Sequence, residues 1–102
     1  MKMYILVKKD ISVGHAIVAV AHASLACYLK FKDSEEVKQW LFGPFYKTVC
    51  VVSEEEFKQS KEAPDHVVIS ESALAGLEVA IAFKPREEYP KSFKFFPLYK
   101  SA

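Results

Sequence analysis

The histidines at positions 15 and 22 are the residues whose type and spacing best suit chemistry. Both lie in the run from His15 to Leu29, which has no charged residue and which we expect to form a helix buried on nearly every side. On a helix, residues seven apart lie within about 20° of each other around the axis and about 10 Å apart along it. Imidazole is the commonest general acid or base in enzymes, so this pair is the first candidate for proton transfer. His22 lies deeper in the helix and also has a structural interpretation, as a core histidine bonded to a backbone carbonyl.

Other kinds of site fit the sequence less well. The imidazoles are His15, His22 and His66, and two zinc ligands on one helix are normally three or four residues apart rather than seven. Three glycines are too few for a phosphate-binding loop or a dinucleotide-binding motif. Cys27 and Cys50 lie in apolar surroundings, where cysteine behaves as a small hydrophobic residue. We therefore expect no metal ion and no cofactor.

Four strands and three helices are expected to position the candidate residues. The strands are predicted over residues 3–8, 47–52, 66–69 and 78–83, and the helices over residues 14–31, 35–41 and 53–61, with a brief helical turn at 87–89. Ser12 is a plausible cap of the first helix, Asp33 or Ser34 caps the second, and Ser53 with Glu56 forms a capping box on the third. Strands separated by helices predict a largely parallel sheet covered on both faces, with the residues 47–52 strand in its interior. The short last connection allows an antiparallel pair. The predicted fold class is therefore α/β, a three-layer α/β/α sandwich with a mixed four-stranded sheet.

Polar side chains follow three of these strands at the point where each strand ends. Sites in open α/β sheets form where loops leave the carboxyl ends of the strands, so these residues are expected to converge near His15. They are Lys8, Lys9 and Asp10 after the first strand, Ser53 and Glu54 after the second, and Ser70, Glu71 and Ser72 after the third. Each also has a plainer explanation, because Asp10 suits a turn, Ser53 a helix cap and Glu71 a solvated surface.

Composition and charge limit the class of protein. The chain has 102 residues, which we interpret as a single domain over residues 1–102. A net charge of +1 argues against a strongly cationic nucleic-acid binder, yet residues 84–102 carry five basic and two acidic side chains, a local charge of +3. Such a tail can touch phosphate, although a solvated basic surface is the plainer explanation. Two distant cysteines, and neither a signal peptide nor an uninterrupted membrane-spanning run, predict a reduced, cytoplasmic setting without membrane contact.

The opening of the chain resembles the type II peptidyl-tRNA hydrolase family. That family begins with a strand, an Arg-x-Asp-Leu turn, a Gly-Lys pair and a helix reading close to Ala-x-Gln-x-x-His-Ala. Residues 5–11 are similar to this opening, Gly14 to His22 has the family's spacing, and His22-Ala23 matches its His-Ala pair. Asp65-His66 is similar too, and residues 80–85 and 96–99 look most like the branch called peptidyl-tRNA hydrolase domain-containing proteins. The resemblance covers essentially the whole chain, with the first helix motif its only specific part.

The resemblance implies a function and a set of site residues. It implies a mixed four-stranded sandwich that is often dimeric, acting in translation on the ester between peptide and tRNA, so we expect tRNA or peptidyl-tRNA as partner and a homodimer. The catalytic candidates are His15, Glu71, Asp10 and His22, and the binding candidates are Lys8, Lys9, Gly14 and Ser70. In this interpretation Glu71 orients or activates water, and Lys8 or backbone amides near Gly14 stabilise the oxyanion.

The sequence departs from the family pattern at several site positions. The family's lysine after the glycine is His15 here, its helix glutamine is Ala19, and its aspartate after the third strand falls at Ser70 or Glu71. Its threonine near the last strand has no counterpart. These departures keep a second interpretation open, a module that kept the fold and lost the chemistry, holding tRNA or another protein through the basic tail. A third is an enzyme that acts on a different small substrate beside His15.

Overall fold

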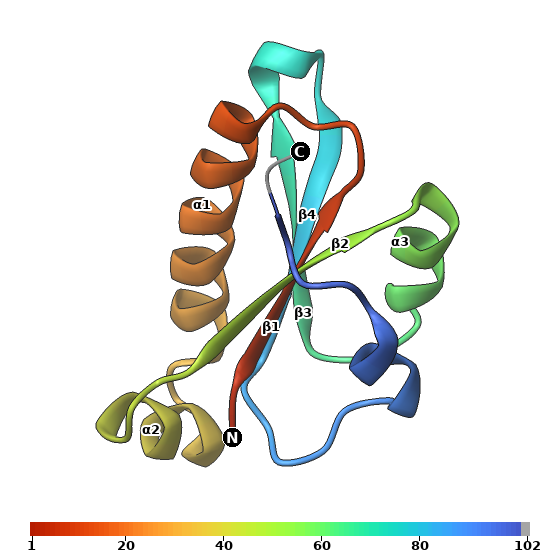
Figure 1. Cartoon of the computed structure of the whole chain (residues 1–102). Helices are drawn as coiled ribbons and strands as arrows, with labels where there is room; N and C mark the ends of the chain where they lie inside the picture. The colour runs from red at the N-terminus through yellow and green to blue at the C-terminus, as the bar shows by residue number, and fades with distance from the viewer. Residues whose placement is uncertain (101–102) are drawn as a thin grey trace.

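A four-stranded sheet with strand order β2-β1-β4-β3 forms the centre of the molecule, as the computed structural model of residues 1–100 shows (Figure 1). Its strands are β1 (Met3–Lys8), β2 (Lys47–Val52), β3 (His66–Glu71) and β4 (Leu77–Phe83). β1 is parallel to β2 and antiparallel to β4, which is in turn antiparallel to β3. The predicted mixed four-stranded sheet is confirmed, including the antiparallel pair at its short last connection.

Helices cover both faces of the sheet, which confirms the predicted three-layer class. α1 (Val13–Phe31) lies on one face with α2 (Glu35–Phe42) below it, and α3 (Glu54–Ser60) lies on the other (Figure 1). A short 3-10 turn, η1 (Ser72–Leu74), joins β3 to β4, and a second, η2 (Lys91–Phe95), lies on the α3 side. Because side chains alternate along a strand, Met3 and Ile5 of β1 pack beneath α1, whereas Tyr4 and Leu6 pack with Phe57 of α3.

α1 is buried along one side only, so the expectation of burial on nearly every side was wrong. Its buried residues are small, namely Ala16, Ala19, Ala23 and Cys27, which lets the helix lie close to the sheet. The opposite side is open, with Ile17 64 % exposed, Leu25 60 % and Leu29 55 %. By length and composition α1 could cross a membrane, but this is weak evidence because the core helix of a soluble protein passes the same test.

β2 is an edge strand, and not the interior strand that its apolar sequence predicted. The chain after η2 returns along its outer edge, where Val51 N–H donates to the carbonyl of Pro97 at 3.0 Å and Tyr99 N–H donates to the carbonyl of Val49 at 2.9 Å. An apolar edge strand is therefore covered by the C-terminal segment rather than by another long strand.

Local signals for element ends were mostly accurate. Ser12, Ser34 and Ser53 cap the three helices as expected, and the capping box of Ser53 with Glu56 is present. β3 runs two residues further than predicted, to Glu71. The helical turn expected at 87–89 is not formed. The chain bends at Glu87, and the first helical turn after β4 is η2, beyond Pro90.

Candidate active site

The carboxyl ends of β1, β2 and β3 lie at one edge of the sheet, and the chain leaving β1 enters α1 there (Figure 1). The loop to α1 includes Asp10, whose φ of 68° is in the left-handed region. The hairpin at this edge is tightened by Ala75 and Gly76, with φ of 57° and 78°. The predicted convergence of three strand ends at one edge is therefore part of the fold.

His15 occupies the first turn of α1, where Ser12 holds it. The Ser12 hydroxyl lies 2.9 Å from His15 Nδ1 and also accepts the His15 backbone N–H as the helix cap. These contacts orient the ring and leave Nε2 for a ligand. Within a helix the N–H groups of the first residues, here Val13 and Gly14, have no intrahelical acceptor, and so they suit a developing negative charge.

The first turn of α1 stands level with the end of β3. At the other end of the helix, Lys30 Nζ donates to the carbonyl of His66, the first residue of β3, at 3.0 Å. From Lys30 back to His15 the helix rises roughly 22 Å, and from His66 to Glu71 the strand advances roughly 17 Å. The two functional candidates are therefore near the same height along neighbouring elements.

Glu71 also lies on the face of the sheet that α1 covers. Val67 and Ile69 pack in the cluster beneath α1, and strand alternation gives Glu71 the same side. The irregularity of pairing between β3 and β4 does not disturb this, because Ile69 pairs with Ala80 and Ser70 with Glu78, so that the extra residue is on β4. Glu71 is half-buried, and His15 is half-buried as well.

Lys8 is not brought together with His15. It lies on the α3 face, 7 % exposed, with its ammonium 3.0 Å from Glu54 and 4.6 Å from the centre of the Phe57 ring. The hydrogen bond from Lys8 holds the pKa of Glu54 below its ordinary value. Lys8 is therefore held in an ion pair on the far side of the sheet, and of the two predicted oxyanion donors only the amides near Gly14 remain as candidates.

The architecture agrees with a comparison of the chain with known families. The model of the family described as peptidyl-tRNA hydrolase PTH2 matches residues 1–88. The chain belongs to the PTH2 family. No curated protein matched the chain in a separate search. The PTH2 match ends before residues 89–100, which include η2 and the segment along β2.

The remaining predicted site residues of this PTH2 chain are spread over the same edge and beyond it. Ser70 is exposed opposite Glu78, whose carboxylate pairs with Lys61 at the C-terminal end of α3, so Ser70 is on the α3 side. Lys9 and Asp10 are exposed in the loop before α1. His22 is exposed rather than buried, which rules out the predicted core role and leaves its imidazole accessible two turns along α1 from His15.

Metal and thiol chemistry find little support in this PTH2 domain. Within residues 1–100 no cluster of three or more His, Cys, Asp or Glu side chains is placed to hold a metal ion. Burial raises the pKa of the Cys27 thiol to about 12 and also raises that of Cys50, so both thiols stay protonated near neutral pH.

The contact that the sequence did not predict is the hydrogen bond from Lys30 to the carbonyl of His66. It joins a helix residue to a strand residue 36 positions away.

Proposed function

We propose that this PTH2 chain hydrolyses the ester between a peptide and tRNA at the edge formed by α1 and β3. The observation that supports the proposal is the common height and common face of His15 and Glu71. The carboxylate of Glu71 takes a proton from water as the water oxygen attacks the ester carbonyl carbon. The first-turn N–H groups of α1 stabilise the oxyanion, and His15 gives a proton to the departing ribose oxygen.

The tRNA partner and the cytoplasmic setting belong to the same proposal. Lys9 is exposed beside the site and is the side chain we assign to phosphate contact. The catalytic roles of Asp10 and His22 stay predictions. Asp10 lies in the turn before α1, and His22 lies on the same side of α1 as His15. A cytoplasmic location follows from a substrate of translation.

The test is release of an N-acetylated amino acid from its tRNA. His15→Ala and Glu71→Gln are each expected to lower kcat by about 100-fold or more, because each removes a proton-transfer group. Glu55→Gln, which changes an exposed carboxylate on α3, is the matched control and should leave turnover unchanged. Full turnover in both site variants would overturn the assignment.

A module without catalysis is the second candidate, favoured by one observation. The family's lysine is replaced by His15, and Lys8 is paired with Glu54 on the far face, so neither supplies an ammonium beside the ester. In that case the wild-type chain shows no release of the amino acid. It still binds tRNA, with an affinity that falls steeply as salt rises because binding rests on phosphate contacts.

A further inference from the structure

Lys2 and Arg86 form a pair of like charges at the end of the sheet opposite the candidate active site. An antiparallel bridge joins Lys2, just before β1, to Arg86, just after β4. Figure 1 shows this end of the sheet, where the chain begins and where it leaves β4. Residues directly opposite each other in an antiparallel pair have their side chains on the same face, with Cβ atoms about 5 Å apart. Because two facing cations repel each other, this pair favours an anion beside it.

Within residues 1–100 no carboxylate lies within ion-pair distance of either cation. The ion pairs there involve other lysines, namely Lys8, Lys61 and Lys84. Glu87 and Glu88 follow Arg86 in the chain, but both are exposed and neither pairs with it. Lys2 and Arg86 are half-buried, and the Arg86 Nε is buried without a hydrogen-bond partner among the described residues. A buried donor of this kind is costly, and a bound acceptor offsets that cost.

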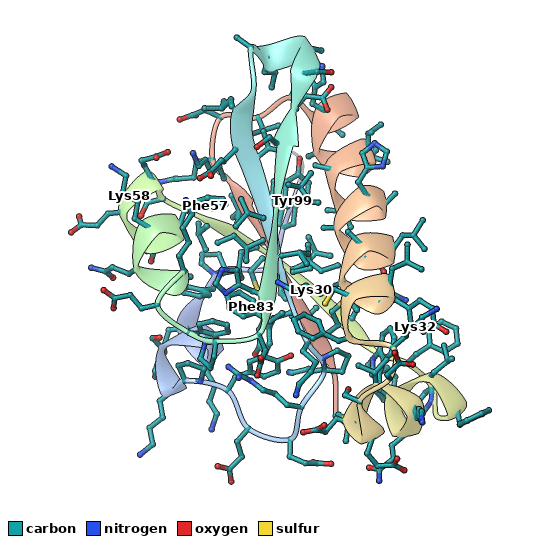
Figure 2. All side chains as sticks on the ribbon, turned by 180° about the vertical axis from the view of Figure 1, so that it is seen from behind. Lys30, Lys32, Phe57, Lys58, Phe83 and Tyr99 are labelled. Atoms are coloured by element: carbon teal, nitrogen blue, oxygen red, sulfur yellow. The ribbon has the colours of Figure 1, made fainter. Side chains whose placement is uncertain are left out.

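Two tyrosine rings that pack against each other hold the two cations in place. Lys2 Nζ lies 5.0 Å from the centre of the Tyr4 ring, and Arg86 Cζ lies 4.7 Å from the centre of the Tyr89 ring. The two rings pack edge-on with their centres 4.8 Å apart. They belong to the aromatic cluster that includes Phe83, which Figure 2 labels. Contacts between cations and rings restrain both side chains without neutralising their charges.

The backbone that carries the two cations is fixed as well. The Tyr89 hydroxyl lies 2.9 Å from the carbonyl oxygen of Lys2 and 2.7 Å from that of Lys84, two residues before Arg86. Pro85 is fully buried, and its ring restricts the backbone just before Arg86. Both cations are therefore positioned before any ligand arrives, which lowers the entropy cost of binding an anion.

We infer that Lys2 and Arg86 together bind a phosphate group. A guanidinium offers a fork of N–H donors that fits two phosphate oxygens, and the ammonium adds a compact charge beside it. The pair lies about 20 Å along β1 from the edge where Lys8 ends that strand, so it is separate from the candidate active site. The phosphate belongs either to the backbone of a tRNA that is bound at that site, which rests on the proposed function, or to a free phosphate compound.

The first experiment is an NMR titration of the isotope-labelled chain with inorganic phosphate, at an ionic strength kept constant with sodium chloride. The Arg86 Nε–H signal and the backbone amide signal of Lys2 should shift and then saturate in the millimolar range. Lys2→Gln and Arg86→Gln should each abolish this saturation, because each removes a charged donor. Lys38→Gln, which removes an exposed cation from α2, is the matched control and should titrate like the wild type. The dispersion of the amide signals shows whether each variant is folded.

The second experiment decides the source of the phosphate by measuring the Kd for deacylated tRNA at several sodium chloride concentrations. If the tRNA backbone occupies the site, Lys2→Gln should raise the Kd about tenfold and lower the slope of log Kd against log salt by about 1. In the release assay the same variant should then raise KM and leave kcat unchanged, because the site is remote from the ester. If a free phosphate compound occupies the site, Lys2→Gln should lose the phosphate titration and bind tRNA like the wild type.

Three outcomes would overturn the inference. They are a wild type whose signals do not saturate with inorganic phosphate, a titration that persists in both Lys2→Gln and Arg86→Gln, and an equal loss of saturation in Lys38→Gln. The phosphate titration needs no turnover. A wild type that binds phosphate but releases no amino acid would therefore overturn the proposed function and leave this phosphate site standing.

Discussion

At the scale of single residues, Lys8 shows how one side chain can suit two roles. In the sequence it stands beside Lys9 and Asp10 at the end of a strand, which is a typical place for a functional cation. In the structure, strand alternation turns it to the α3 face, where Glu54 and the Phe57 ring hold its ammonium. The position therefore stabilises the packing of α3 on the sheet.

The Lys8–Glu54 pair predicts a pH-dependent stability. Because the pKa of Glu54 is lowered in the folded chain, its carboxylate form favours folding at pH values above the ordinary value of 4.5. That stabilisation is lost as the pH falls through the lowered pKa. The free energy of unfolding of Glu54→Gln, measured with urea, should fall below that of the wild type near neutral pH.

The same comparison at acid pH supplies the check. Near pH 3 the difference between wild type and Glu54→Gln should shrink, because protonation removes the charge in the wild type as well. Glu55→Gln, a change at a neighbouring exposed carboxylate, should show no such trend. A difference for Glu54→Gln that stayed constant from neutral to acid pH would contradict the assigned ion pair.

At the scale of elements, α3 depends on its first turn because it has only seven residues. Ser53 Oγ accepts the Glu56 N–H at 3.1 Å, and Glu56 Oε1 accepts the Ser53 N–H at 2.8 Å. Short helices are marginal without such caps and tertiary packing. The start of this helix was therefore predictable from the local sequence.

Ser53→Ala is expected to lower the free energy of unfolding by about 1 kcal/mol, since it removes one acceptor of the reciprocal pair. Urea denaturation followed by circular dichroism measures the loss. Ser72→Ala, an exposed serine in η1, is the control and should change stability by less than about 0.5 kcal/mol. Equal effects of the two changes would mean that the capping box adds nothing to α3.

At the scale of the whole molecule, the C-terminal segment beyond the PTH2 match is part of the core. Phe93 is 3 % exposed and packs edge-on against Phe83 and Tyr4, with ring centres 5.0 and 5.3 Å apart. The Tyr89 hydroxyl lies within 2.9 Å of the carbonyls of Lys2 and Lys84. The segment joins α3, β4 and the start of the chain into one packed face.

Phe93→Ala is therefore expected to lower the free energy of unfolding by about 3–5 kcal/mol, the range for removing a buried aromatic ring. Thermal or urea unfolding measures this. Phe95→Ala, two residues away and exposed, should stay within about 0.5 kcal/mol of the wild type. A small effect of Phe93→Ala would show that the segment is a loose tail.

Much of the fold followed from local signals, and the site followed only in part. Helix caps, β-branched runs and the breaks at Gly43 and Pro85 act over a few residues, so their positions can be found along the chain. The placement of His15 and Glu71 toward the same end of the sheet depends on the parallel direction of β1 and β3 and on the height of α1 beside β3. That Lys8 lies away from His15 could be found only once the side of the sheet that it faces was known. The sequence of a single strand does not specify that side.

Some predictions stay open after the structure. The single domain over residues 1–102 is one, because positions 101–102 lie outside the described residues and the family match ends at residue 88. The catalytic roles at His15 and Glu71 are others, and the release assay decides them.

The sequence alone determined which segments become helices and strands, because propensity, capping and apolar periodicity act between near neighbours. Only the tertiary structure decided which of those segments are covered by other parts of the chain. An apolar run looks the same whether a sheet, a returning tail or nothing lies over it, and so both the outer side of α1 and the edge position of β2 escaped prediction. Coverage depends on contacts between residues far apart in the chain, and these form only when the whole chain has folded.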